Sequence, residues 1–185
     1  VQFFNPNLAL NMLPKMFPEF YYYGAPENIP EPQLLPRGPR DPPMAHAEEI
    51  AQKIGNKKPF FLFINSSETH LPFDTPATQI TPEYTQAITH FYEATRSKKI
   101  YKTNTRPVGE QERELILAAQ VRAVEWVDSQ LVILVANLPK EFPTLCVIMG
   151  DHGEEVGENG RYGHGYPSPQ VMQIPLWATV LEKQV

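Results

Sequence analysis

The sequence predicts a three-layer α/β domain with a mostly parallel sheet, and three observations support this prediction. Three continuous apolar runs have the length of strands buried on both faces: PFFLFIN (59–65), TLCVIMG (144–150) and IPLWATVL (174–181). A long helical pattern separates the first two runs, and two shorter ones lie on either side of the first. Strands that alternate with helices normally form a parallel sheet with helices packed on its faces.

The helical segments are indicated by apolar residues that recur three and four positions apart. Residues 44–56 have the pattern of a short amphipathic helix, and a second helix is expected from Thr81, with Pro82 at its first position. The strongest pattern covers residues 108–138 and predicts one long helix packed on the sheet. Its apolar stripe comprises Ile116, Ala119, Ala123, Val127, Leu131, Leu134 and Leu138.

Residues 1–43 differ in composition from the rest of the chain. They contain half of the 20 prolines, a density that excludes a long helix or a central strand. Because the segment is also rich in Leu, Met, Phe and Tyr, we expect irregular chain that wraps over a core. Residues 44–185 should form that core, within a single domain.

Charge and hydropathy exclude several classes of partner. The net charge of −5 argues against nucleic acid or an anionic membrane surface, since both need clustered Lys and Arg. No apolar run approaches the ~20 residues of a membrane span, and no signal peptide is visible. We expect a soluble protein and leave the compartment open between cytoplasm and periplasm. The single cysteine, Cys146, lies within an apolar run and is expected to be a small buried hydrophobe.

Polar side chains follow two of the apolar runs, where an open parallel sheet places its ligand sites. Thr69 and His70 come after the first run, and Asp151 and His152 come directly after the second. A carboxylate and an imidazole at one strand end can face a single cation, and oxygen and nitrogen ligands suit Zn²⁺ or Mn²⁺. His164 follows in a glycine-rich loop. These side chains are candidates for a metal and anion site.

The DHG tripeptide alone also fits a simpler interpretation. Asp151 and His152 could be a hydrogen-bonded pair in a turn, and the tripeptide does not decide between the two. Gly153 is expected to let the backbone turn sharply there. Glu154 and Glu155 are predicted to be solvated loop charges.

Two longer stretches, taken in order, make the pattern more specific. PFFLFINSSETHLPFDTP and LCVIMGDHGEEVGENGRYGHG, separated by a long helix, resemble the sulfatase family of the alkaline-phosphatase superfamily. ETHLPF stands where that family has a PHxPY-like turn, and GDHG stands where it has SDHG or SDNG. The closing VMQIPLWA resembles the family's segment before its last core strand. The resemblance covers residues 59–178 and implies an alkaline-phosphatase-like fold.

The resemblance implies a metal-dependent hydrolase of sulfate or phosphate esters, acting on a small anionic ester. Asp151 and His152 would be ligands of a divalent metal, with Mn²⁺, Zn²⁺, Ca²⁺ and Mg²⁺ left open. His70 and His164 would bind the sulfuryl or phosphoryl oxygens and stabilise charge on the leaving group.

The sequence also departs from the family pattern. Two acidic ligands after the first strand, and a nucleophile in a CxPxR-like motif, are usual in the family but are not found here. Ser66, Ser67 and Thr69 match family positions that are not nucleophiles. We therefore expect the C-terminal portion of a catalytic domain, completed by upstream sequence or by a partner chain. The alternative is a non-catalytic sulfatase-like module with at most weak metal or oxyanion binding.

Overall fold

A computed structural model describes residues 19, 42–55, 59–73, 75–99 and 107–183, with only the backbone of 96–99. The wrapping segment predicted at 1–43 lies almost entirely outside these ranges. The chain divides into two units, each described by itself. Unit 1 comprises Val1–Gln79 and Ala119–Pro139, and unit 2 comprises Ile80–Ala118 and Lys140–Val185.

The first predicted helix is confirmed in unit 1. A 3-10 turn, η1 (Pro43–His46), leads into α2 (Ala47–Ile54), and Gly55 follows with a φ of +52°. The buried face of this segment packs against α4 and forms the core of the unit. Its buried members are Met44, Ala47, Ile50, Ala51 and Leu134, with Leu62, Ile64, Trp126, Val127, Leu131 and Leu138 partly buried around them.

Residues 59–65 form no strand in the described structure. Leu62 and Ile64 pack against the core of unit 1, whereas the alternate residues Phe61 and Phe63 are exposed. The predicted strand, buried on both faces, is therefore wrong here. A continuous apolar run supplies two apolar faces, but only one of them meets the helices of unit 1.

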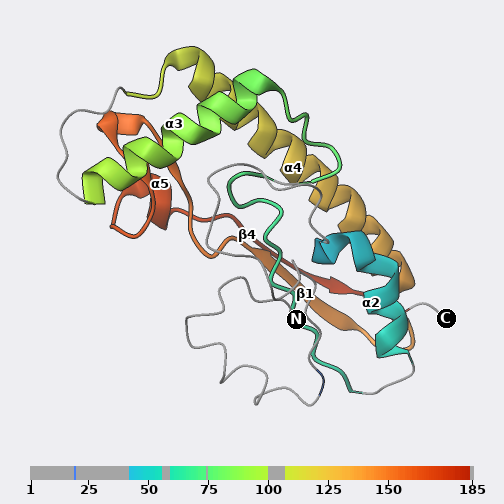
Figure 1. Ribbon diagram of the computed structural model, residues 1–185. Helices are drawn as coiled ribbons and strands as arrows, with labels where there is room; N and C mark the ends of the chain where they lie inside the picture. Colours follow the sequence, from blue (N-terminus) through green and yellow to red (C-terminus); the bar gives the residue numbers. More distant parts are fainter. Residues whose placement is uncertain (1–18, 20–41, 56–58, 74, 100–106, 184–185) are drawn as a thin grey trace. The chain divides into compact units, whose positions relative to one another are not determined.

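The long helix is confirmed as one uninterrupted element, α4 (Glu110–Asn137), drawn in gold in Figure 1. Four members of the predicted stripe are buried and the other three are partly buried, as the spacing of three and four requires. Other apolar side chains of α4 are exposed, Val132 among them. Neither α4 nor any other helix in the described ranges is long and apolar enough to cross a bilayer.

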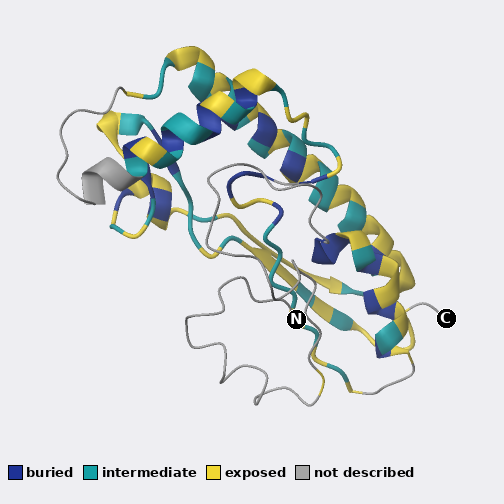
Figure 2. Cartoon of the chain, viewed as in Figure 1, coloured by how far each residue is buried: buried dark blue, intermediate teal, exposed yellow. Residues whose placement is uncertain are grey.

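In unit 2, α3 (Pro82–Lys99) begins as predicted. The hydroxyl oxygen of Thr81 accepts a hydrogen bond from the backbone N–H of Tyr84 (3.2 Å), which caps the first turn. The buried face of α3, visible in dark blue in Figure 2, contains Tyr84, Ala87, Ile88, Phe91 and Ala94. The ring of Phe91 meets that of Tyr162 edge to face, with centroids 6.1 Å apart.

Two of the predicted strands are confirmed as β1 (Thr144–Met149) and β4 (Leu176–Leu181). They pair antiparallel with each other, with Met149 opposite Leu176. A second small antiparallel sheet joins β2 (Glu155–Val156) to β3 (Tyr162–Gly163), with the 3-10 turn η2 (Glu158–Gly160) between them.

The prediction of a mostly parallel sheet is therefore wrong for the described residues. They form only antiparallel pairs, and residues 59–65 form no strand that could join such a sheet. The reason lies in the connection: a parallel pair is usually joined by a crossover helix that packs on the sheet. Between β1 and β4 there is instead the β2–β3 hairpin and α5 (Pro169–Met172), which has only four residues.

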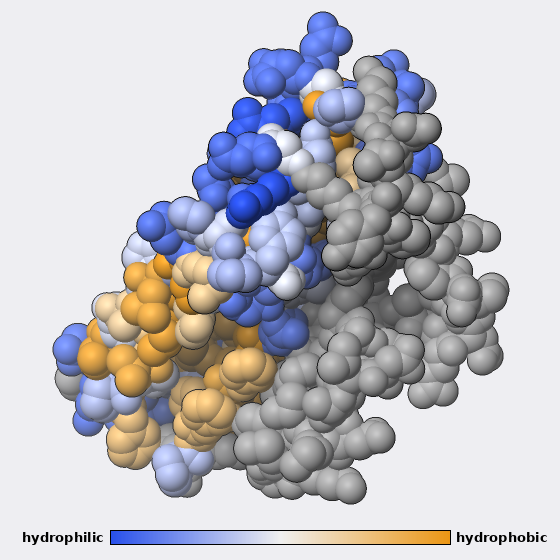
Figure 3. All heavy atoms as spheres, turned by 90° about the vertical axis from the view of Figure 1, so that its left-hand side faces the viewer, coloured by the Kyte–Doolittle hydropathy of each residue, from blue (hydrophilic) through white to orange (hydrophobic). Residues whose placement is uncertain are grey.

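Both strands were also expected to be buried on both faces, which the structure contradicts. Most of their residues are exposed, as the yellow of the β1–β4 pair in Figure 2 shows, and Cys146 is only half-buried. The exposed large side chains of this pair are Leu145, Val147, Ile148, Met149, Leu176, Trp177 and Val180. Apolar atoms also gather in one region of the surface shown in Figure 3. Among the described residues, β1 and β4 pair only with each other, and most of the apolar side chains on their faces are exposed.

Candidate functional site

Asp151 and His152 follow β1 directly, and their side chains face each other. The Asp151 carboxylate is 82% exposed; its Oδ1 accepts from the His152 backbone N–H (2.9 Å), and its Oδ2 lies 3.8 Å from His152 Nε2. Nδ1 of His152 donates to the carbonyl oxygen of Gly153 (2.9 Å), because a carbonyl can only accept. In the neutral ring, the lone pair is then on Nε2, beside the carboxylate. Metal-binding histidines are commonly oriented by such a bond from their other nitrogen.

The backbone at Gly153 is held by the segment that contains α5. The backbone N–H of Gly153 donates to the carbonyl oxygen of Val171 (2.9 Å), and a Cβ added at Gly153 would lie 1.9 Å from the backbone oxygen of Gln170. Glycine is required here by this close approach. The expected sharp turn is not its reason, since Gly153 is not among the residues with positive φ.

The β2–β3 hairpin returns the chain from the DHG turn to His164. Its tight turn includes Gly157, Asn159 and Gly160, which all have positive φ. The imidazole rings of His152 and His164 consequently stack, with centroids 4.0 Å apart and planes 30° from parallel. Three of the predicted site residues, Asp151, His152 and His164, thus lie together in unit 2.

Glu154 and Glu155 are not the solvated charges that the sequence suggested. The side chain of Glu154 is 13% exposed, and its Oε2 lies 3.0 Å from Nδ1 of His164. Glu155 is fully buried and accepts a hydrogen bond from the hydroxyl of Tyr166 (2.6 Å). Each carboxylate also has a second oxygen, Oε1, that is buried without a hydrogen-bond partner among the described residues.

These two glutamates could have been found from the sequence if the hairpin had been recognised. The stretch EEVGENGRYGH has a glycine- and asparagine-rich turn between short flanks, which is a hairpin signal. Once the turn is centred on residues 157–161, Glu154 falls opposite His164. Without that register, the stretch around the two glutamates looks like a solvated loop, because it is rich in charged residues and glycine.

His70 lies in a compact turn of unit 1. Its backbone N–H donates to the carbonyl oxygen of Ser67 (3.0 Å), and its carbonyl accepts from the N–H of Phe73 (2.7 Å). The hydroxyl of Ser66 donates to Glu68 (2.7 Å), a buried carboxylate that also accepts from the N–H of Met44 (2.7 Å). The other three candidates belong to unit 2, so convergence of His70 with them stays a prediction.

The donors in unit 2 fit part of a metal site. The 3.8 Å between Asp151 Oδ2 and His152 Nε2 lies within the roughly 4 Å that two ligands, each about 2.0–2.2 Å from one ion, can span. In the described ranges, however, no group of three or more His, Cys, Asp or Glu side chains could hold an ion. Asp151 and His152 thus offer two donors of the types that such a site uses.

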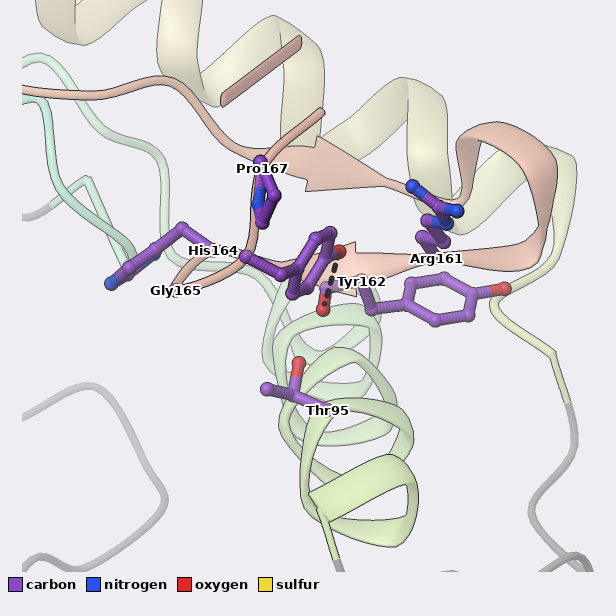
Figure 4. Close-up of a pocket in the computed structure, with 7 residues that line it drawn as sticks. Thr95, Arg161, Tyr162, His164, Gly165 and Pro167 are labelled. Carbon is purple, nitrogen blue, oxygen red and sulfur yellow. Dashed lines mark hydrogen bonds between the residues drawn. The ribbon is translucent and has the colours of Figure 1, made fainter. Parts of the chain in front are cut away.

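A hollow of about 520 Å³ adjoins His164. Its lining consists of Thr95, Arg161, Tyr162, His164, Gly165, Tyr166 and Pro167. Figure 4 shows the imidazole of His164 pointing away from Arg161, so these two groups do not converge on one point. The Arg161 guanidinium lies 5.8 Å from the centre of the Tyr166 ring. Burial, and then the hydrogen bond to Glu155, raise the pKa of Tyr166, which keeps its hydroxyl a neutral donor.

An aspartate and a histidine at a strand end, beside a second histidine, have the donor types of a site for a divalent metal and an anion. The family comparison agrees with this class of site: the chain belongs to the sulfatase family, whose model matches residues 14–176. Membership implies an alkaline-phosphatase-like fold and a relation to sulfate ester hydrolases. Neither a curated protein nor a solved structure matches the chain.

Proposed function

We propose that this chain supplies part of the metal and oxyanion site of a hydrolase of sulfate or phosphate esters. The observation that carries the proposal is the stacking of His164 on His152, 4.0 Å apart, with the Asp151 carboxylate beside the latter. An anionic ester is stabilised when a cation and hydrogen-bond donors surround its oxygens. Family membership supports the same chemistry.

Each residue has a distinct part in the proposal. Asp151 Oδ2 and His152 Nε2 would hold a divalent ion, which when bound polarises an ester oxygen as a Lewis acid. His164, in its protonated form, would donate a hydrogen bond from Nε2 to another ester oxygen, and the family pattern gives His70 the same part. Their donors favour the charge that moves onto these oxygens as the ester bond breaks.

The organic part of the ester would occupy the hollow beside His164. Its volume of about 520 Å³ falls within the range of roughly 300–1,000 Å³ typical of small-molecule sites. Its lining offers two tyrosine rings and a proline for apolar contact, together with the threonine hydroxyl and one guanidinium. These features suit a small ester whose alcohol part is a ring with polar groups.

A second candidate function is a non-catalytic sulfatase-like module. It is favoured by one observation: in the part of the chain that the structure describes, the metal donors at the site number two rather than three. In this alternative, metal and oxyanion binding are weak or absent.

A metal titration followed by thermal unfolding tests the proposal. An ion that binds only the folded state stabilises it by RT ln(1 + [L]/Kd), about 2.7 kcal/mol at a hundredfold excess over Kd. For a chain of this size, that is a rise in Tm of roughly 5–11 °C. With two ligands, we expect a smaller rise with Mn²⁺ or Zn²⁺, lost in Asp151→Asn and retained in Asp128→Asn, which removes an exposed carboxylate of α4. No metal-dependent shift at millimolar concentration would favour the non-catalytic module.

Turnover provides a separate test of what the chain can do alone. We expect no hydrolysis of an aryl sulfate or an aryl phosphate, because no nucleophile is assigned among its residues. Hydrolysis that persists in the purified chain, and disappears in Thr69→Ala or Ser66→Ala, would place the nucleophile within this chain.

A further inference from the structure

We propose that Glu154 is a positioning residue of this site, whose carboxylate fixes the orientation of the His164 ring. It does so by accepting a hydrogen bond from Nδ1, so that Nε2 is the ring nitrogen turned away from the carboxylate. When the ring is protonated, Nε2–H is then the donor offered to an anion. The identity of that anion rests on the proposed function. The orientation of the ring does not.

The backbone places the two residues opposite each other. In the β2–β3 pair, Val156 is opposite Tyr162 and Glu155 is opposite Gly163. The next position of the same register is Glu154 opposite His164. Side chains directly opposite each other on antiparallel strands lie on the same face of the sheet and within reach of each other. The hairpin therefore determines which carboxylate meets His164.

Two contacts then fix the ring. Oε2 of Glu154 lies 3.0 Å from Nδ1, and since an ionised carboxylate can only accept, Nδ1 carries the hydrogen. The face of the ring stacks on His152, with centroids 4.0 Å apart. A bond at one nitrogen and a contact across the ring face restrict both the position and the rotation of the imidazole. Nε2 is then held at the end of the ring opposite the carboxylate.

Glu154 is more buried than His164, as expected if the carboxylate holds the ring and the ring contacts a ligand. The Glu154 side chain is 13% exposed, whereas that of His164 is 36% exposed. Water therefore screens the carboxylate little, and its hydrogen bond is stronger than one at the surface. His164 stays accessible beside the hollow that it helps to line.

The residue before His164 supports this arrangement. Gly163 has a φ of +85°, and a Cβ there would lie 3.1 Å from Cγ2 of Thr95 and 3.5 Å from Oε1 of Glu154. The hairpin thus approaches both α3 and the Glu154 carboxylate closely, which a side chain at this position would hinder. The Thr95 hydroxyl donates to the carbonyl oxygen of Phe91 (3.0 Å).

If the Glu154 carboxylate had only a structural role, its burial would lower the stability of the folded chain. Its Oε1 is buried without a hydrogen-bond partner among the described residues, and such an oxygen destabilises a folded protein. Buried groups of this kind call for an explanation outside packing. Orientation of His164 provides one.

The first test reads the tautomer of His164 and needs neither metal nor anion. Side-chain ¹H–¹⁵N correlation spectra of the neutral ring should show the hydrogen on Nδ1 in the wild-type chain. In Glu154→Ala we expect the hydrogen to move to Nε2, the form that neutral histidine prefers in water. Glu154→Gln keeps the shape and should give a mixture, because an amide can either accept from Nδ1 or donate to it.

A matched control separates orientation from hairpin stability. Glu158 is a carboxylate of the same hairpin, held by Arg113 (2.7 Å) and by the N–H of Val156 (2.6 Å). Glu158→Gln should weaken the hairpin yet leave the His164 tautomer unchanged. If Glu154→Ala and Glu154→Gln both keep the hydrogen on Nδ1, the positioning role is refuted.

The second test titrates inorganic sulfate at a pH low enough to protonate the ring, so that Nε2 can donate, and follows the His164 resonances. We expect Glu154→Ala to bind sulfate about tenfold more weakly, the low end of the loss when a site histidine loses its orienting partner. Equal affinity in both chains would refute the positioning role and leave the proposed function in place. If the wild-type chain fails to bind sulfate, the proposed oxyanion role of His164 fails, while the tautomer result still decides the role of Glu154.

Discussion

The rings of His152 and His164 stack 4.0 Å apart, although twelve positions separate the two residues along the chain. Their contact depends on two backbone arrangements. The segment around α5 holds the backbone at Gly153, and the β2–β3 hairpin returns the chain to His164. The geometry of the candidate site is therefore determined by backbone contacts outside it, which can be tested separately from its chemistry.

Gly153→Ala should destabilise the chain strongly. The added Cβ would lie 1.9 Å from the backbone oxygen of Gln170, so main chain has to move, and we expect a loss of about 2–3 kcal/mol in the free energy of unfolding. Gly150→Ala is the matched control, because a Cβ there meets only ordinary contacts of 3.5 Å and beyond. It should change stability by less than about 0.5 kcal/mol in urea denaturation. Equal stability of the two variants would contradict this close approach.

Leu134→Ala should show the importance of the buried face of α4. Leu134 is 5% exposed and packs in the core of unit 1, so its truncation should cost about 2–5 kcal/mol. Val132, on the same helix, is 66% exposed, and Val132→Ala should cost less than about 0.5 kcal/mol. Both are measured by urea denaturation followed by circular dichroism. A similar cost for the two substitutions would mean that the wrong face has been assigned to the core.

The helices were predictable from sequence because local signals mark them: apolar spacing in α2 and α4, and the cap in α3. The stripe from Ile116 to Leu138 and the cap at Thr81 are local signals, and the structure confirms both. The positions of β1 and β4 were equally predictable. Their pairing was not, because a continuous apolar run says how much of a strand can be buried but not which strand lies beside it. The direction of pairing depends on the connection between the strands. The predicted parallel direction is wrong, since β1 and β4 are antiparallel.

The candidate site was predictable in part for the same reason. Placing Asp151 and His152 at the end of a strand needs only the strand and the residue types that follow it. The stacking of His164 on His152 needs the hairpin register, and so does the contact of Glu154 with His164. A register is a relation between two segments, and the composition of either segment does not contain it.

Glu158→Gln should remove a pH-dependent part of the stability. Burial acts to raise the pKa of Glu158, but the hydrogen bonds from Arg113 and from backbone N–H groups outweigh it, so the pKa falls below its ordinary value of 4.5. A lowered pKa gives stability that is present above the unfolded value and lost as the pH falls through the folded one. At pH 7 the variant should be about 1 kcal/mol less stable than wild type.

This difference should shrink as the pH is lowered below about 4.5, which is measured by urea denaturation at a series of pH values. A difference that stays constant across the series would show that the carboxylate contributes through packing rather than charge.

Tyr166→Phe should destabilise unit 2 by leaving a buried carboxylate without its donor. The Tyr166 hydroxyl donates to Oε2 of Glu155 (2.6 Å), and Glu155 is fully buried, so we expect a loss of about 1–3 kcal/mol at pH 7. Burial and this hydrogen bond raise the pKa of Tyr166 above 10.0. A raised pKa gives stability that is full below the unfolded value and lost as the pH rises through the folded one. The advantage of wild type should therefore decline above about pH 10.

A double-mutant cycle with Glu155→Gln isolates this interaction. If the hydroxyl and the carboxylate interact as the structure indicates, the double variant should lose less stability than the two single losses together, by roughly 0.5–3 kcal/mol. Chemical denaturation of the four chains at pH 7 gives this coupling energy. Additive losses would mean that the Tyr166 hydroxyl contributes through other contacts, such as those it makes to the carbonyl oxygens of Tyr162 (3.2 Å) and Gly163 (3.3 Å).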